Sequence, residues 1–193
     1  LDNWHIDVIC AELERMITGE NTRLIINIPP RYMKSIICSV AFPAFILGHF
    51  PQEAIVCVSY AEELAKKLAA DCRRVMESAW YRRIFPNTRL AATRREIMDF
   101  ETTRGGGRYA ATVGGTLTGR GGNWIIIDDP IKPAAANSDL IRNKVNDWYG
   151  STLYSRLNDK KNGKILLIMQ RTHEQDLTGY LVESKVGFKH IVM

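Results

Sequence analysis

The sequence has few residues that could cross-link it and no segment long enough to cross a membrane. Its four cysteines lie far apart, form no Cys-x-x-Cys pair, and three of them fall within apolar runs. We therefore expect buried, reduced thiols rather than a disulfide framework or a cysteine-based metal site. The longest apolar stretch, Ile36 to Gly48, is too short for a bilayer and contains Pro43, and no segment has the pattern of a signal peptide. These absences favour a cytosolic protein without membrane association.

The composition that remains is that of an ordinary globular domain. Hydrophobic residues make up 46% of the 193 residues and charged residues 24%, which suits a single α/β domain with a substantial core. There is no internal repeat and no low-complexity linker. Because the chain stops at Met193 within an apolar run that resembles a strand, we expect residues 1–193 to be one domain, a fragment of a longer protein.

The charge of the chain is uneven. The formal net charge is +5, and arginines crowd one region that holds fewer acids. They are Arg73, Arg74, Arg82, Arg83, Arg89, Arg94, Arg95, Arg104 and Arg108. Two interpretations stay open: a surface that meets nucleic acid or another acidic partner, and a solvated face with scattered salt bridges.

Hydrophobic periodicity predicts strands that alternate with helices. The expected strands are 24–28, 54–59, 97–101, 108–113, 124–128, 164–169 and a short one near 188; the expected helices are 4–17, 34–47, 61–78, 139–156 and 174–184. This alternation predicts a mostly parallel sheet flanked by helices. Ligands of such sheets bind beyond the carboxyl ends of the strands. A Lys-Ser turn, an Asp-Asp pair and Gln170 all fall at such ends.

The turn after the first strand carries the residues of a phosphate-binding loop. Lys34 and Ser35 occupy the positions from which a lysine reaches the β- and γ-phosphates and a hydroxyl binds Mg²⁺. The usual pattern has glycines at its first and sixth positions, where this chain has Ile28 and Met33. Two prolines before Arg31 would stiffen the turn instead, and we expect Lys34 to lie in an exposed turn. The alternative is an incidental Lys-Ser at a helix start.

Two adjacent carboxylates end a second buried strand. Asp128 suits the binding of Mg²⁺, and Asp129 is placed to orient or deprotonate an attacking water. Acids before a proline also occur in plain turns and helix caps, so this pair alone does not distinguish a catalytic site from a turn or cap. Together with the Lys-Ser turn, it predicts a nucleoside triphosphatase that uses ATP and Mg²⁺.

Five motifs, in order, resemble the large terminase subunit of tailed bacteriophages and prophages. They are residues 27–35 (NIPPRYMKS), 58–61 (VSYA), 114–122 (GGTLTGRGG), 125–130 (IIIDDP) and 169–174 (MQRTHE). The resemblance implies a P-loop NTPase of the additional-strand (ASCE, RecA-like) type, a motor that pumps double-stranded DNA through a portal. Such proteins also carry a C-terminal RNase H-like nuclease; no late set of acids follows Gln170, so we expect no nuclease activity from residues 1–193. The implied partners are DNA bound without regard to sequence, the portal protein, the small terminase subunit and further copies in a ring, in the cytoplasm of a bacterial host.

The resemblance also implies roles for individual residues. Pro30, Arg31, Tyr32, Met33, Lys34 and Ser35 correspond to the Walker A loop, with Ser35 and Asp128 at the magnesium ion. Asp129 stands where many terminases have a catalytic Glu, and Gln170 matches the coupling motif. Arg31 corresponds to the arginine common in the loop, and Arg120 lies where some terminases supply an arginine finger; with Asp129 and Gln170 these are the expected catalytic residues. Trp4 and His5 precede the first strand at the distance of an adenine-contacting segment, although a core or surface role is the simpler alternative.

Two other functions stay open on the sequence alone. One is a P-loop ATPase or helicase-like protein with no part in packaging, although further helicase motifs are missing. The other is an inactive prophage remnant that only binds partners.

Overall fold

The described part of the chain folds around a single eight-stranded sheet. The computed structural model describes residues 3–115, 117 and 119–193. The strands are β1 Arg23–Asn27, β2 Ala54–Ser59, β3 Leu90–Arg95, β4 Asp99–Thr102, β5 Gly107–Thr112, β6 Trp124–Asp128, β7 Lys164–Met169 and β8 Lys189–Val192. They lie in the order β3-β4-β5-β2-β6-β7-β1-β8. From β5 across the sheet to β8 all neighbouring strands are parallel, whereas β4 pairs in the antiparallel sense with both of its neighbours, β3 and β5. The expected mostly parallel α/β sheet is confirmed.

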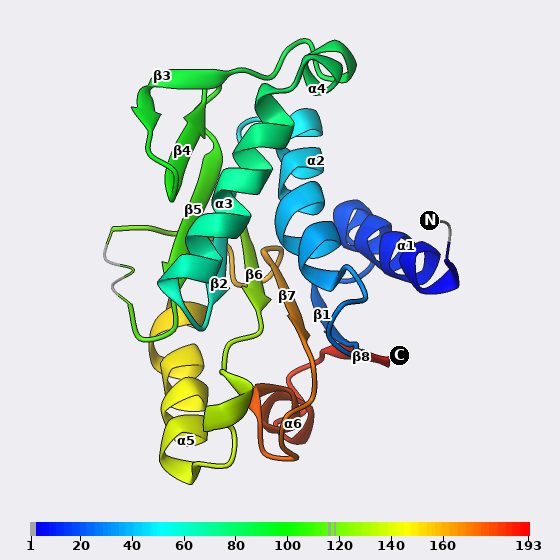
Figure 1. Ribbon diagram of the computed structural model, residues 1–193, viewed down its shortest axis with the longest axis vertical. Coiled ribbons are helices and arrows are strands. Elements are labelled where there is room, and N and C mark those ends of the chain that lie inside the picture. The colour runs from blue at the N-terminus through cyan, green and yellow to red at the C-terminus, as the bar shows by residue number, and fades with distance from the viewer. Residues whose placement is uncertain (1–2, 116, 118) are drawn as a thin grey trace.

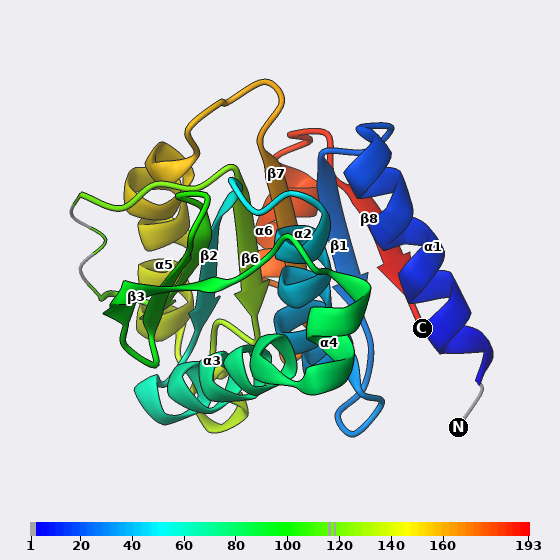
Figure 2. The ribbon, with the colours of Figure 1, turned by 90° about the horizontal axis from the view of Figure 1, so that it is seen from above.

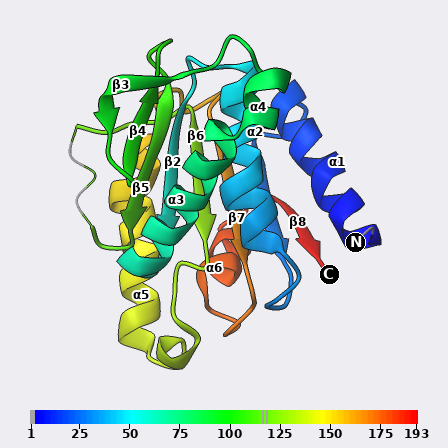
Figure 3. The ribbon, with the colours of Figure 1, turned by 45° about the horizontal axis from the view of Figure 1, so that its top comes forward.

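Helices cover both faces of this sheet, as Figures 1, 2 and 3 show. They are α1 Trp4–Thr18, η1 Ile36–Ala41, α2 Phe42–His49, α3 Glu62–Glu77, α4 Ala79–Ile84, η2 Pro133–Ala135, α5 Asp139–Trp148, η3 Tyr149–Leu153, η4 Tyr154–Arg156 and α6 Leu177–Glu183. Helices α1 to α4 lie on one face, and α5 and α6 lie on the other. None of these helices is long and apolar enough to cross a membrane.

The central strands are buried on both faces, as their apolar sequences predict. All residues of β1 and β6 are buried. Alternate side chains enter separate cores: Ile126 belongs to the core beneath α1 to α3, whereas Ile125 and Ile127 belong to the core beneath α5 and α6. This period of two is the geometry of a strand. Cys38, Cys57 and Cys72 are buried free thiols, as expected, whereas Cys10 is exposed.

Several boundaries differ from the sequence-based expectation. The helix expected over 34–47 is interrupted by the π-helical turn η1, and the one expected over 139–156 becomes α5 followed by η3 and η4. Helix α6 begins at Leu177 rather than near residue 174, because the Asp176 side chain accepts a hydrogen bond from the Gly179 N–H and caps the helix there. Gly19 ends α1 as expected, with φ +82°.

The region between α3 and β4 holds the elements that the sequence pattern missed. Helix α4 is short, and β3 is an edge strand whose residues are half-buried or exposed, so neither shows a clear apolar period. One arginine of the crowded region also lies elsewhere than expected. Arg108, on β5, is 1% exposed and contributes nothing to the surface charge.

The sheet order has one consequence for chemistry. Strand β7 lies between β1 and β6, which is the additional-strand arrangement that the resemblance implies. In the register of β7, Met169 pairs with Asn27 on one side and Ile168 pairs with Asp128 on the other. The residues that follow β1, β7 and β6 therefore meet at one edge, as the expected carboxyl-end site requires.

Candidate functional site

The loop after β1 adopts a backbone conformation that usually requires glycine. Arg31 has φ +70° and Met33 has φ +61°, a left-handed conformation that costs on the order of 1–2 kcal/mol for a residue with a side chain. Met33, at the position of the second glycine of the usual loop, thus adopts a backbone conformation that glycine adopts readily. The side chains of Arg31, Tyr32 and Met33 are exposed, but Lys34 is 6% exposed. The expectation that Lys34 lies in an exposed turn is wrong, because its side chain turns inward to a carboxylate.

That carboxylate is Asp129, which joins three elements. Lys34 Nζ lies 2.8 Å from Asp129 Oδ2, and the two side chains are 7% and 17% exposed. The Gln170 N–H donates to Asp129 Oδ1 at 3.1 Å. The Asp129 N–H donates to the Ile168 carbonyl, and its own carbonyl accepts from the Tyr60 N–H. These bonds hold Asp129 at φ +44°, so the surrounding structure over-determines a strained residue, as is common at functional sites.

Asp128 lies deeper and is held by two serine hydroxyls. Ser35 Oγ donates to Asp128 Oδ1 at 3.0 Å, and Ser39 Oγ donates to Oδ2 at 2.7 Å. Burial raises the pKa of Asp128 to about 6, with a smaller contribution from the charge of Asp129, while the hydroxyl of Ser39 and that of Ser35 act in the opposite direction. A buried carboxylate with so little cationic compensation favours a bound cation.

The donor atoms at this point fit a magnesium ion. Asp128 and Ser35 offer hard oxygen ligands, and Ser35 is only half-buried. Among the described residues there is no group of three or more His, Cys, Asp or Glu side chains that would form a metal cage. Mg²⁺ is typically bound by one or two protein oxygens together with substrate phosphates and water, so a sparse oxygen site beside a phosphate-binding loop suits it.

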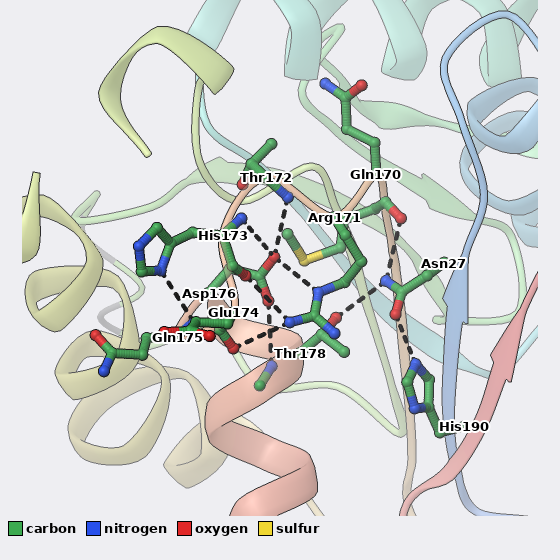
Figure 4. A network of polar contacts seen from close by, with 12 residues as sticks. Asn27, Gln170, Arg171, Thr172, His173, Glu174, Gln175, Asp176, Thr178 and His190 are labelled. Carbon is green, nitrogen blue, oxygen red and sulfur yellow. Dashed lines mark hydrogen bonds and ion pairs between the residues drawn. The ribbon is translucent and has the colours of Figure 1, made fainter. Parts of the chain in front are cut away.

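The segment after β7 forms a tight turn around a buried carboxylate (Figure 4). Asp176, which is 1% exposed, accepts hydrogen bonds from Arg171 Nε at 3.0 Å and from the Thr172 N–H at 3.1 Å. The Gln170 side chain points away from this network, and its backbone N–H contacts Asp129 instead. Gln170 therefore lies between this turn and the ion pair of Lys34 with Asp129.

A buried amide connects this turn to the strand that carries the loop. Asn27 Nδ2 donates to the Met169 carbonyl at 3.2 Å and to Thr178 Oγ1 at 3.0 Å, and Asn27 Oδ1 lies 2.6 Å from His190 Nε2. The Met169 carbonyl can only accept a hydrogen bond, so the amide nitrogen of Asn27 must face it and the amide oxygen Oδ1 must face His190. Because Oδ1 also only accepts, Nε2 of His190 must carry the proton. Burial and the charge of Arg171 lower the pKa of His190. Asn27 was not predicted as a site residue, although a polar residue that ends an apolar strand is a visible signal.

Aromatic rings lie beside the exposed rim of the loop. The His5 and Tyr32 rings are 5.5 Å apart and perpendicular, and the Trp4 ring lies 6.1 Å from His5. His5 is 7% exposed, and its Nε2 has no hydrogen-bond partner within the described residues. The structure thus places Trp4 and His5 next to a residue of the loop.

Arg120 is the one predicted site residue that lies apart from this cluster. The Gly122 N–H donates to the Arg156 carbonyl, and the Asn123 N–H donates to the carbonyl of Ala54, the first residue of β2. The segment after Arg120 therefore lies at the amino ends of β2 and β6, opposite the phosphate-binding loop. Arg120 forms an ion pair with Asp99, and its guanidinium lies 5.4 Å from the Tyr109 ring centre. Thr116 and Thr118, part of the same glycine-rich motif, lie outside the described residues. Within one chain, Arg120 does not reach the site.

The strand order and the loop after β1 define a P-loop NTPase fold of the terminase-like, additional-strand type. No family model and no curated protein matches the sequence. Among solved structures, the crystal structure of the HK97 bacteriophage large terminase is similar, with a TM-score of 0.57 and 15% sequence identity. The similarity covers 94% of this chain and 38% of that one. At this identity the likeness concerns the fold, and the chain spans well under half of the terminase it resembles.

Proposed function

We propose that this chain is the ATPase motor domain of a large terminase subunit of a phage or prophage, which hydrolyses ATP to drive double-stranded DNA into a procapsid. The observation that carries the proposal is the pair of contacts across β7, Lys34 with Asp129 and Ser35 with Asp128. They join a phosphate-binding cation and a metal-binding hydroxyl to two acids at the carboxyl edge of the sheet. The likeness to the HK97 large terminase supports the fold on which this arrangement rests.

The contacts suggest how the site would change when ATP enters. The backbone from Pro30 to Met33 would surround the phosphates, and Lys34 would turn from Asp129 to the β- and γ-phosphates. A bound magnesium ion, held by Ser35 and Asp128, would neutralise the charge of the phosphates. Asp129, released from its cation, would then accept the proton of the attacking water. In the free protein the ion pair keeps this base occupied.

Gln170 would report that change to the rest of the domain. Its N–H bonds to the same carboxylate that Lys34 leaves, and the turn that follows is fixed by Asp176 and tied through Asn27 to β1 (Figure 4). Movement of the Asp129 carboxylate would therefore displace the start of this turn. Arg31 and, from a neighbouring subunit, Arg120 would add positive charge at the γ-phosphate.

The base of the nucleotide would lie against the aromatic rim. The Tyr32 and Trp4 side chains are exposed, so their rings are accessible for stacking. The His5 ring lies beside Tyr32, and its buried Nε2 has no partner within the described residues, so a turn of this ring toward a purine edge would give Nε2 a hydrogen bond. The ligand would thus contact the loop with its phosphates and α1 with its base.

Double-stranded DNA would contact the arginines at the edge of the sheet. Of the nine arginines in this region, five are exposed and form no ion pair with any carboxylate of the described residues. They are Arg82, Arg83, Arg89, Arg95 and Arg104. They lie on α4, on β3 and in the turns beside them, so phosphate contacts without base reading are the interaction they suit. Portal protein, small subunit and further copies in a ring complete the proposed partners.

The test is a direct titration of the purified chain with a fluorescent ATP analogue, with and without Mg²⁺, followed by phosphate release. The proposal expects Mg²⁺-dependent binding and slow turnover that rises when the protein is concentrated or assembled on a portal ring. Binding without turnover under all conditions would favour the inactive remnant. Turnover stimulated by single-stranded nucleic acid and indifferent to a portal would favour an ATPase outside packaging.

A further inference from the structure

The helix that follows the phosphate-binding loop is widened at one place, and its sequence explains why. In an α-helix the Ser39 carbonyl would accept from the N–H of residue 43, but residue 43 is proline and has none. The chain instead forms the π-helical turn η1, in which the Phe42 N–H donates to the Ile37 carbonyl five residues back. π-Turns inside α-helices often occur at functional sites.

The carbonyl that Pro43 leaves without its helical donor has a donor from another strand. Arg108, on β5, extends its guanidinium to the Ser39 carbonyl, with Nη2 at 3.3 Å. Arg108 is 1% exposed, and within the described residues its Nε and Nη1 have no hydrogen-bond partner. A buried guanidinium with so few bonds is costly. Arg108 also lies beside the Cys57 thiol on β2, and its bond to the Ser39 carbonyl is what fixes the guanidinium against the helix.

Ser39 itself connects that contact to the acid at the proposed metal site. It is 1% exposed, and its hydroxyl donates to Asp128 Oδ2 at 2.7 Å. Ser35, four residues earlier on the same helix face, donates to the other oxygen at 3.0 Å and is only half-buried. One carboxylate oxygen is thus bound in the core, and the other lies toward the loop.

We propose that Ser39, held by Arg108 in the turn that Pro43 creates, is a positioning residue that fixes the Asp128 carboxylate for the cation. The inference rests on the proposed function, since it assigns the cation to Asp128 and Ser35. Ser39 does not touch the ion or the nucleotide. Its hydroxyl occupies Oδ2 and so keeps Oδ1 directed to the site, while Arg108 keeps the Ser39 backbone in place.

The experiment measures magnesium affinity rather than activity. Binding of a fluorescent ATP analogue is followed at increasing Mg²⁺ in the wild type and in Ser39→Ala. Loss of an outer-shell partner typically weakens metal affinity by about 10–100-fold, so the Mg²⁺ concentration at half-effect should rise at least about tenfold. Binding of the analogue without Mg²⁺ should be unchanged, because Ser39 contacts no part of it.

The matched control removes a buried hydroxyl near the end of the same helix. Thr88 is 2% exposed and donates to the Leu47 carbonyl at 3.1 Å, with no contact to Asp128. Thr88→Val should leave the Mg²⁺ dependence at the wild-type value. A drop in Mg²⁺ affinity equal to that of Ser39→Ala would overturn the proposal, since it would assign the effect to general loosening of the helix.

A second variant keeps the test decisive if Ser39→Ala folds poorly. Arg108→Met replaces the buried cation by an apolar side chain of similar length, a change that cores commonly tolerate. It should weaken Mg²⁺ affinity in the same direction and leave metal-free binding intact. Unchanged Mg²⁺ affinity in a folded Ser39→Ala or Arg108→Met protein would overturn the role of that residue. If the wild type binds no nucleotide at all, the proposed function fails as well.

Discussion

The two ends of the central sheet differ in how they hold charge. At the carboxyl end, Lys34 and Asp128 are 6% and 1% exposed, and each contacts a specific partner. At the other end, near the β3 edge, Arg94 and Arg120 share the carboxylate of Asp99, and their side chains are 42% and 30% exposed. The first arrangement is fixed and desolvated, whereas the second is shared and open to water.

The difference indicates where a single substitution should matter. A buried ion pair brings little net stability, but removing one partner leaves a costly uncompensated charge. An exposed pair contributes about 0–1 kcal/mol, and a neighbour can replace it. Changes at the carboxyl end should therefore alter both chemistry and stability, and changes at the edge should alter only interactions with other molecules.

Lys34→Ala should have the largest effect. We expect ATP turnover to fall by about a thousandfold or more, because a cation at the transferring phosphate is lost. The melting temperature should also fall, because Asp129 loses its partner. The double variant Lys34→Ala/Asp129→Asn should recover the melting temperature but not the turnover. Wild-type turnover in Lys34→Ala would show that the loop after β1 is not the nucleotide site.

Arg120→Ala tests the contrast between the two ends of the sheet most directly. A loss of turnover in this variant would assign a catalytic role to a residue at the end opposite the phosphate-binding loop. We expect normal ATP binding and a loss of turnover of about a thousandfold on a portal ring. Mixing Arg120→Ala with Lys34→Ala subunits should restore part of the activity, since the finger of one would serve the intact loop of the other. If the mixture recovers no turnover and wild-type turnover does not depend on protein concentration, Arg120 acts within its own subunit or has only a structural role.

Substitution of the two adjacent acids should separate metal binding from turnover. Asp128→Asn should weaken Mg²⁺-dependent nucleotide binding by more than the roughly 10–100-fold that loss of an outer-shell partner costs, because it removes the charged oxygen that Ser35 and Ser39 hold in place. Asp129→Asn should bind Mg-ATP nearly normally and lose turnover. The two are compared by titration of a fluorescent ATP analogue and by phosphate release. Equal loss of binding in both would remove the basis for separate roles.

The stability of the metal-free protein should depend on pH through Asp128. Burial raises its pKa to about 6 from a usual 3.8, so between these values the folded protein binds more protons than the unfolded chain. The free energy of unfolding should therefore decrease as pH rises from about 4 to 6. Asp128→Asn should remove this component, which denaturant titrations at several pH values would measure. An unchanged pH dependence in the variant would contradict the burial-raised pKa.

The smallest effects should come from the exposed arginines of the edge. DNA binding by this chain should be weak, indifferent to sequence and steeply salt-dependent. Replacing Arg89 and Arg104 by Ala should lower the affinity equally for all sequences and reduce the salt slope by about one for each lost phosphate contact. Arg74, already paired with Asp71, is the matched control and should change little. An anisotropy titration that finds sequence preference would contradict this assignment.

Much of this fold could be predicted from local pattern. The apolar runs of β1, β2, β6 and β7 marked strands buried on both faces, because only such strands lack alternation. The alternation of these strands with helices predicted a parallel sheet. The polar residues that follow the strands were therefore expected to meet at one edge of that sheet. The Lys34-Ser35 pair and the Asp128-Asp129 pair were predicted to share one site, and they do lie together. Their roles stay predictions.

The rest depended on contacts between distant residues. Strand β3 and helix α4 lack a clear period, so only their packing against β4 and α3 fixes them. Arg108 belonged by sequence to a charged surface, yet it is buried in the core with Ser39 on η1 and Cys57 on β2. Ser39, by sequence an ordinary helix residue, contacts Asp128 from 89 positions away. The sequence alone thus determined which elements form and where their ends meet, because these follow from local period and chain direction. The tertiary structure decided which charges are buried and what each contacts, because desolvation depends on neighbours that are remote in the chain.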